Sequence, residues 1–222
     1  MKKMLTIDVV SDPVCPWCFV GKRRLESAIA QLPELDITVR WHPFQLNPDM
    51  PREGRNRQEY YREKFGEERA KMMLSGLQET GADEGISFGQ DPEAVSPNTL
   101  SAHVLMHWAN LDENVDANAL AEKIFRAHHE ACENIGDHQV LTRIAGEVGM
   151  NEELVATQLA AGADEVAVQE SIAHSVQLGV SGVPFFVVNG KYGISGAQPP
   201  ESLVSAFGQI AAEGESVSDT KN

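Results

Sequence analysis

The sequence predicts an α/β protein in which two short α/β segments flank a long run of helices. Three observations support this class: a strand–helix–strand pattern at the start, a middle block with helical periodicity only, and a strand hairpin followed by a helix near the end. Alternating strands and helices are typical of a sheet covered by helices. The length of 222 residues allows one domain with an insertion, or two modest domains.

The first α/β segment covers residues 4–44. Residues 4–10 are apolar with β-branched side chains, which predicts a strand. Apolar residues then recur at helical spacing from Cys18 to Leu32, and Pro33 ends the pattern, so we expect a helix that begins at or just after Cys18. Residues 37–44 return to strand-like alternation, which completes the opening of a βαβ unit.

The middle block is predicted to be almost entirely helical, from about residue 58 to residue 178. A first helix is expected from Tyr60 to Thr80, and a later one should use Ser96 as N-cap with Pro97 in its first turn. The remaining helices are expected at residues 117–131, after Asp137, after Asn151, and at residues 163–178 before Gly179.

The last segment returns to β structure. Residues 184–188 form an apolar strand, Asn189-Gly190 is a strong hairpin signal, and residues 191–195 form the return strand. A final helix is expected to begin within residues 196–200. This is the arrangement of a thioredoxin fold with a large inserted α-helical domain. The predicted division is 1–50 for the first part of the thioredoxin-fold domain, 51–165 for the insertion, 166–212 for the second part, and 213–222 for a tail expected to be disordered.

The sequence Cys15-Pro16-Trp17-Cys18 lies between the first strand and the first helix. A C-x-x-C pair there is a candidate redox dithiol, because helix-start N–H groups and the helix dipole favour a negative sulfur. We expect Cys15 to be the more exposed and more acidic thiol, and Cys18 the shielded one.

Zinc is the competing interpretation of two such cysteines. A structural zinc site needs four ligands, and the remaining cysteine is Cys132, which follows His128 and His129 on a predicted helix. The sequence therefore predicts no metal, a Cys15–Cys18 disulfide in the oxidised protein, and a free Cys132.

The charge balance is strongly acidic, with 33 acidic and 18 basic residues and a net charge of −15. Such a surface argues against nucleic acid or an anionic membrane as partner. Residues 4–8 are too short and too polar for the apolar part of a signal peptide, which predicts a cytoplasmic protein. In a reducing compartment a C-x-x-C pair is more often catalytic than structural. The sequence leaves the oligomeric state open.

Several stretches together resemble one family. They are Ser11-Asp12-Pro13-Val14-Cys15-Pro16-Trp17-Cys18 with Gly21-Lys22, Pro43-Phe44-Gln45-Leu46-Asn47-Pro48, Asn98-Thr99 with Ala102-His103, Gly179-Val180-Ser181-Gly182-Val183-Pro184, and Ile194-Ser195-Gly196-Ala197-Gln198. From about Thr6 to Phe207 the chain resembles the DsbA-like thioredoxin-fold oxidoreductases of the FrnE type. That group is related to the 2-hydroxychromene-2-carboxylate isomerases and the kappa-class glutathione transferases.

The resemblance implies thiol–disulfide chemistry. Cys15 matches the nucleophilic cysteine, Cys18 the resolving cysteine, and Pro184 a cis-proline that faces the dithiol. Val183 would then offer its backbone to an extended substrate. Pro16 and Trp17 are further candidates for substrate contact, although Trp17 could equally serve to cover the disulfide.

Other polar residues near these motifs have two interpretations each. Lys22 and the two arginines after it either help to hold Cys15 as a thiolate or, for at least two of the three, form a solvated helix face. Asp12 either transfers protons or, more simply, caps the active-site turn. The candidate residues for an inter-domain groove are Asn98, Thr99, His103 and Gln198.

The leading functional prediction is a thiol–disulfide oxidoreductase that forms a mixed disulfide. It requires no metal or nucleotide, glutathione is a candidate co-substrate, and the partner is a disulfide-containing protein or a small thiol or disulfide. One alternative is a glutathione-dependent isomerase or transferase, in which serine commonly replaces Cys15, so that the cysteine pair argues against it. A second alternative is a non-catalytic binding or chaperone module that uses the inter-domain groove.

Overall fold

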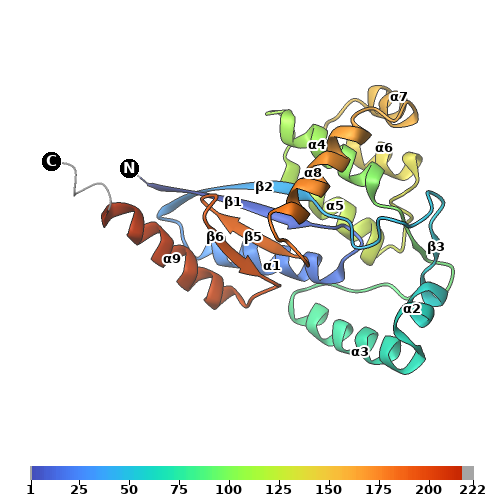
Figure 1. Ribbon diagram of the computed structural model, residues 1–222, viewed down its shortest axis with the longest axis horizontal. Coiled ribbons are helices and arrows are strands. Elements are labelled where there is room, and N and C mark those ends of the chain that lie inside the picture. Colours follow the sequence, from blue (N-terminus) through green and yellow to red (C-terminus); the bar gives the residue numbers. More distant parts are fainter. Residues whose placement is uncertain (1, 217–222) are drawn as a thin grey trace.

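The computed structural model describes residues 2–216, and it confirms an α/β fold built on a four-stranded sheet (Figure 1). The strand order is β2-β1-β5-β6, with β1 parallel to β2 and the other neighbours antiparallel. The strands are β1 (Lys3–Ser11), β2 (Leu35–Pro43), β5 (Phe185–Val188) and β6 (Tyr192–Ser195). The helices α1 (Pro16–Ala30) and α9 (Pro200–Ser216) pack against each other on the lower side of the sheet in Figure 1.

The core lies between this sheet and its helices. Leu5, Ile7 and Val9 alternate along β1 and are almost completely buried. Phe19 of α1 and Phe207 of α9 are fully buried in the same cluster. Burial of large apolar side chains contributes about 1.5–3 kcal/mol each, so this cluster fixes the position of α1 beneath β1.

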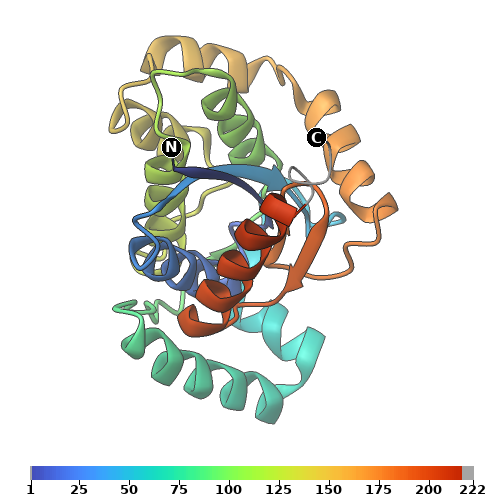
Figure 2. The same ribbon diagram turned by 90° about the vertical axis from the view of Figure 1, so that its left-hand side faces the viewer.

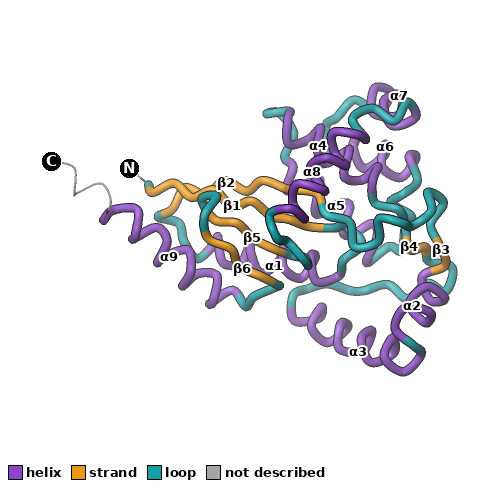
Figure 3. Tube along the Cα trace, in the orientation of Figure 1, coloured by secondary structure: helices purple, strands orange, loops and turns teal. Residues whose placement is uncertain are grey.

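The helices between β2 and β5 form two groups. They are α2 (Arg57–Phe65), α3 (Glu67–Asp83), α4 (Leu100–Leu111), α5 (Ala117–His129), α6 (His138–Gly146), α7 (Glu152–Ala160) and α8 (Glu165–Gln177). Figures 1 and 2 show α2 and α3 on one side of α1, and α4 to α8 on the other side. A two-stranded sheet of β3 (Arg55–Asn56) and β4 (Val95–Ser96) lies at the base of α2 (Figure 3).

Several local predictions are confirmed. Asp137 and Asn151 are the N-caps of α6 and α7, and each side chain accepts a backbone N–H of its helix. Asn189 and Gly190 both have positive φ, at 52° and 65°, as a tight hairpin between β5 and β6 requires.

Two helix boundaries differ from prediction. Helix α1 begins at Pro16, not at Cys18, because Cys15 serves as its N-cap and Pro16 suits the first turn. The helix predicted from Tyr60 to Thr80 is two helices, since Gly66 between them has a φ of 81° that ends the helical path.

Three further predictions are wrong. Ser96 does not cap a helix: it pairs in β4, and α4 begins at Leu100. Cys132 lies beyond α5, in a loop and at a φ of 59°, rather than on a helix. Residues 213–216 belong to α9 and are therefore not a disordered tail, whereas residues 217–222 lie outside the described residues.

The predicted domain limits at residues 50 and 165 stay predictions. Among residues 2–216, no helix combines the length and the apolar character that a membrane span requires.

Candidate active site

The turn that leads into the dithiol is held by Asp12, which follows the end of β1. Its backbone oxygen accepts the Cys15 N–H at 2.9 Å. Its carboxylate is fully buried and accepts the Leu46 N–H at 2.8 Å and the Val14 N–H at 3.4 Å. Asp12 thus caps the active-site turn and ties it to the loop after β2, which is the simpler of its two predicted roles.

Cys15 lies at the N-terminus of α1, where the first N–H groups of a helix have no partner within the helix. Its thiol donates to the Val183 carbonyl oxygen at 3.7 Å, although 168 residues separate the two in sequence. Its exposed fraction is 5%, compared with 1% for Cys18. The order of exposure matches the prediction, but both thiols are buried.

Cys18 lies in the first turn of α1, and its N–H donates to the Cys15 carbonyl at 3.0 Å. Burial raises the pKa of the Cys18 thiol well above its ordinary value, and the neighbouring Cys15 sulfur adds to the rise. Cys18 therefore keeps its proton at neutral pH. The two sulfurs, which are both free thiols here, differ in their surroundings.

The segment before β5 completes the site from the far end of the chain. The Val183–Pro184 peptide bond is cis. Pro184 packs on Gly21 of α1, where an added Cβ would lie 2.8 Å from the Pro184 Cγ. Glycine at position 21 thus permits the close approach that brings the Val183 carbonyl to Cys15.

A cavity of about 360 Å³ adjoins the cysteine, and we call it the dithiol groove. One wall is the active-site turn with Trp17, which is 43% exposed; the opposite wall is formed by α2 and α3. Its lining is Val14, Cys15, Pro16, Trp17, Leu46, Asn47, Tyr61, Lys64, Phe65, Met73, Leu74 and Leu77. The charged member of this set, Lys64, donates to Asn47 and to the Tyr60 hydroxyl. The groove is therefore mainly a hydrocarbon surface beside a thiol.

The basic residues of α1 do not form a solvated face, and that prediction is wrong. Lys22 is 2% exposed and binds Glu26 at 2.5 Å and Glu122 at 3.0 Å, while Arg23 also binds Glu122. Arg24 binds Glu84 at 2.5 Å and the Ala197 carbonyl at 2.7 Å. The ion pairs join α1 to α5 and to the end of α3, and the Arg24 hydrogen bond joins α1 to the segment before α9.

Two of the four candidate groove residues, Asn98 and Thr99, lie together and both accept from Gln45, at 3.5 and 3.4 Å. Asn98 accepts the Leu100 N–H at 3.0 Å and donates to the Met50 carbonyl at 2.6 Å, which is helix-start chemistry. Thr99 is buried, and Gln198 donates to the Ser195 carbonyl at 2.7 Å. Within the described part of the chain, none of these three lines the dithiol groove.

His103 is also absent from that groove, as far as residues 2–216 show. It is 4% exposed, donates from Nε2 to the Phe44 carbonyl at 2.9 Å, and lies 3.6 Å from a carboxylate oxygen of Asp12. His103 thus supports the active-site turn from behind.

A second histidine, which no local sequence pattern indicates, supports the same turn. His129 donates from Nε2 to the Pro13 carbonyl at 2.9 Å, 116 residues away, and stacks on Phe19 and Phe125. Burial and the Arg57 charge lower its pKa to about 3. A neutral imidazole is thus built into the wall behind the dithiol. The adjacent His128 has a pKa well below its ordinary value, through burial first and then His129.

Across residues 2–216, no three or more His, Cys, Asp or Glu side chains are grouped as a metal site would require. The third cysteine, Cys132, accepts a hydrogen bond from Arg57 at 4.0 Å, and its sulfur packs against Gly89.

The sheet, the two flanking helices and a C-x-x-C pair at the start of α1 define a thioredoxin-fold protein with a vicinal dithiol. A family model described as a DSBA-like thioredoxin domain matches residues 6–208. The chain therefore belongs to the DSBA-like thioredoxin family, which confirms the resemblance found in the sequence.

Solved structures agree with this assignment. A probable DsbA oxidoreductase from Streptomyces coelicolor is 30% identical, with a TM-score of 0.85 over 94% of this chain and 91% of that one. A 2-hydroxychromene-2-carboxylate isomerase (17% identity, TM-score 0.70, 96% and 98% covered) shares the fold. So does the cytosolic disulfide reductase DsbM from Pseudomonas aeruginosa (20% identity, TM-score 0.64, 92% and 98% covered), which has also been solved with GSH.

Proposed function

We propose that this protein is a thiol–disulfide oxidoreductase that works through a mixed disulfide at Cys15. The observation that carries the proposal is the unequal setting of the two sulfurs. Cys15 borders the dithiol groove at a helix N-terminus, whereas Cys18 is shielded and its pKa is raised. An attacking sulfur must be reachable and ionisable, while a resolving sulfur is best kept protonated until it is needed.

In the reductive direction, the Cys15 thiolate attacks one sulfur of a substrate disulfide. A Cys15–substrate S–S bond forms, and the other substrate sulfur leaves as a thiolate that takes a proton from solvent. Cys18 then loses its proton and attacks the Cys15 sulfur, which releases the second substrate thiolate. The protein ends with a Cys15–Cys18 disulfide and the substrate is reduced by two electrons; the oxidative direction is the reverse.

The surrounding residues have positioning and binding roles in this proposal. The Val183 backbone, held against α1 by Pro184, lies next to Cys15 and offers hydrogen bonds to an extended segment of substrate. Pro16 and Trp17 form the near wall of the dithiol groove. The proposed partner is a disulfide-containing protein or a small disulfide, with glutathione as a candidate reductant and neither metal nor nucleotide required.

The cytoplasmic setting is likewise part of the proposal. The structural neighbour DsbM is described as a cytosolic disulfide reductase and was solved with GSH, which supports both the location and the candidate co-substrate.

A glutathione-dependent isomerase is the second candidate, favoured by the shared fold with the 2-hydroxychromene-2-carboxylate isomerase. Isomerisation needs no resolving thiol, so the presence of Cys18 one helical turn from Cys15 favours disulfide exchange. An insulin-reduction assay, run beside an isomerase assay on 2-hydroxychromene-2-carboxylate, separates the two candidates.

The decisive experiment traps the intermediate. In Cys18→Ser, attack by Cys15 still occurs but resolution does not, so mixed disulfides should accumulate and should be released by dithiothreitol. Cys132→Ser is the matched control and should trap nothing. Mixed disulfides found mainly at Cys132, or alkylation of Cys18 or Cys132 ahead of Cys15 at mildly acidic pH in the wild type, would show that the roles are assigned wrongly.

A further inference from the structure

The resolving step of the proposed mechanism needs an ionised Cys18, although the surroundings of this sulfur oppose ionisation. Cys18 is 1% exposed, and burial and the nearby Cys15 sulfur raise the pKa of its thiol. A buried anion is stabilised by hydrogen-bond donors or by a positive charge close to it. The donors around Cys18 therefore decide how readily a mixed disulfide is resolved.

The titratable groups around the active-site turn already have other partners. The Asp12 carboxylate accepts two backbone N–H groups. His103 and His129 each donate to a backbone carbonyl, and burial keeps the His129 imidazole neutral by lowering its pKa to about 3. The three basic residues in the middle of α1 are paired with glutamates. An uncharged donor is thus the group best placed to help Cys18 ionise.

Ser11, the last residue of β1, supplies such a donor. Side chains alternate along a strand, so Ser11 lies on the same face of β1 as Val9. Val9 and Cys18 belong to one buried cluster on that face. The Ser11 hydroxyl is buried and makes no hydrogen bond with another described residue. It faces the Cys18 sulfur and, together with the Asp12 backbone, favours the ionised form of that thiol by lowering its pKa.

This hydroxyl is unfavourable in the resting protein but favourable during the reaction. A buried donor without a partner has given up its hydrogen bond to water. When Cys18 ionises, the hydroxyl gains a negatively charged acceptor, and hydrogen bonds to charged groups are the stronger ones. Part of this gain persists in the transition state, where the negative charge is shared between the attacking and the leaving sulfur. An interaction that is stronger there than in the resting state lowers the barrier.

We propose that Ser11 is a catalytic residue of the resolving step, whose hydroxyl donates to the Cys18 sulfur as that thiol ionises and attacks the mixed disulfide. The Cys18 proton goes to solvent, and the Cys15–Cys18 bond forms. The bond between Cys15 and the substrate sulfur breaks, so that the substrate leaves as a thiolate. Ser11 itself is not chemically changed. The inference rests on the proposed function and adds the group that lets its buried thiol ionise.

Two opposing effects set the expected size of the contribution. A hydrogen bond to an ionised group shifts the ionisation equilibrium about tenfold to a hundredfold. A thiolate of lower pKa is also a weaker nucleophile, with a Brønsted coefficient of about 0.4–0.5, so roughly half of the shift reaches the rate on a logarithmic scale. Removal of the hydroxyl should therefore slow resolution about threefold to tenfold at neutral pH.

An aromatic disulfide that releases a coloured thiolate, dithiobis(nitrobenzoic acid), separates the two steps in a stopped-flow measurement. The reference protein is reduced and carries Cys132→Ser, and the reagent is equimolar. Attack by Cys15 releases the first coloured thiolate, and attack by Cys18 releases the second. Ser11→Ala should leave the first phase unchanged and slow the second about threefold to tenfold.

Ser96→Ala is the matched control. Ser96, in β4, also has a buried hydroxyl that makes no hydrogen bond with a described residue. Its removal should leave both phases as they are in the reference protein. A titration gives a second readout that a change in packing alone would not move: in protein with Cys15→Ser and Cys132→Ser, the Cys18 ¹³Cβ signal reports ionisation, and Ser11→Ala should raise its midpoint pH.

The outcomes separate this inference from the proposed function. A second phase in Ser11→Ala as fast as in the reference protein, equal slowing of both phases, the same slowing in Ser96→Ala, or an unchanged Cys18 midpoint would overturn the role of Ser11. A second phase that persists in Cys18→Ser would instead overturn the proposed function, because Cys18 would then not be the resolving thiol.

Discussion

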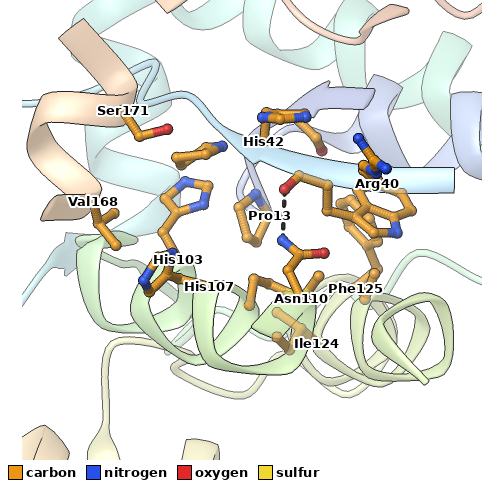
Figure 4. A pocket seen from close by; sticks show the side chains of 15 residues that line it. Pro13, Arg40, His42, His103, His107, Asn110, Ile124, Phe125, Val168 and Ser171 are labelled. Carbon is orange, nitrogen blue, oxygen red and sulfur yellow. Dashed lines mark hydrogen bonds between the residues drawn. The ribbon is translucent and has the colours of Figure 1, made fainter. Parts of the chain in front are cut away.

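The dithiol groove and a second cavity, of about 260 Å³ between the edge strand β2 and the helices α4, α5 and α8 (the β2-edge cavity), meet the same short segment of chain but differ in their chemistry (Figure 4). Val14 to Trp17 line the groove, while Ser11 and Pro13 line the cavity. The groove offers hydrocarbon and one thiol, and its lysine is already bound within the protein. The cavity has mainly apolar walls, and its lining includes the basic side chains Arg40, His103 and His107 but no carboxylate of a described residue.

This difference indicates two kinds of selectivity. An apolar groove beside a nucleophile tolerates many side chains, because hydrophobic contact is not directional. Its selectivity must come from the disulfide that reacts. A cavity whose lining holds basic groups and no carboxylate disfavours a cationic ligand, because a like charge there would have no partner.

The two sites are separated by a rigid wall. Asp12 binds the loop after β2, and His129 holds the Pro13 carbonyl. Both side chains are buried, so the segment from 11 to 14 is fixed from the side of the sheet and from the side of α5.

The largest expected effect comes from Cys15→Ser. Disulfide reduction should fall to the uncatalysed rate in an insulin-reduction assay, because no other described thiol lines the groove. Residual turnover of more than a few per cent of the wild type would mean that another thiol does the chemistry, and a double variant with Cys132→Ser would identify it.

The buried histidines behind the active-site turn should make the stability of the protein depend on pH. The His129 pKa is about 3 in the folded state and about 6.5 in the unfolded chain, so below pH 6.5 only the unfolded state takes up the proton. The free energy of unfolding is therefore at its full value, as far as His129 determines it, above pH 6.5. It falls as the pH drops toward 3, by an amount on the order of several kcal/mol. The lowered pKa of His128 acts in the same direction.

Urea unfolding between pH 7 and pH 4 measures this dependence. His129→Gln keeps an N–H donor for Pro13 but does not titrate, so it should be less stable than the wild type at pH 7 and lose less stability on acidification. An unchanged slope of stability against pH in His129→Gln would contradict the assignment.

A smaller effect is expected at the contact that brings Val183 to the dithiol. Gly21→Ala places a methyl group about 2.8 Å from the Pro184 Cγ, so the two segments must separate. We expect a loss of about 1–3 kcal/mol in stability and a drop in reductase activity. Gly208→Ala in α9 is the matched control, because nothing lies within 4 Å of its added Cβ. If the two variants behave alike in both stability and activity, the contact has no role.

The sequence predicted the features that depend on local signals. Apolar β-branched residues identified β1 and alternation identified β2. The Asn189-Gly190 pair identified the hairpin, and the position of the C-x-x-C pair identified the dithiol. It failed where a residue's environment is set by distant partners. The burial of Lys22 was not predicted, because only one of its two partners, Glu26, is local, and the other, Glu122, lies 100 positions away.

The same reason explains why the sequence does not predict the role of His129 or the β2-edge cavity. The link from His129 to Pro13 spans 116 residues, and neither residue shows a local pattern that predicts it. The β2-edge cavity collects residues from one strand, the turn after β1 and several helices, so no stretch of sequence contains it. The misplaced start of α4 has a local cause: Ser96 and Pro97 have the right chemistry for a helix start, but pairing of β4 with β3 takes precedence.

The smallest predicted effect concerns Trp17 and decides between its two interpretations. Trp17 is 43% exposed and lines the groove next to Cys15, a position that suits contact with a bound polypeptide. If it binds substrate, Trp17→Ala should raise KM for a protein disulfide about fivefold to thirtyfold, since an aromatic contact at an interface contributes about 1–2 kcal/mol, while kcat changes little. Reduction of a small disulfide such as hydroxyethyl disulfide should be almost unaffected, and Trp17→Phe should restore most of the loss. Trp108→Phe, which removes an indole bonded to Asp164 away from the groove, is the control. A faster reaction of Trp17→Ala with the small disulfide, with KM for the protein substrate unchanged, would show instead that Trp17 covers the dithiol.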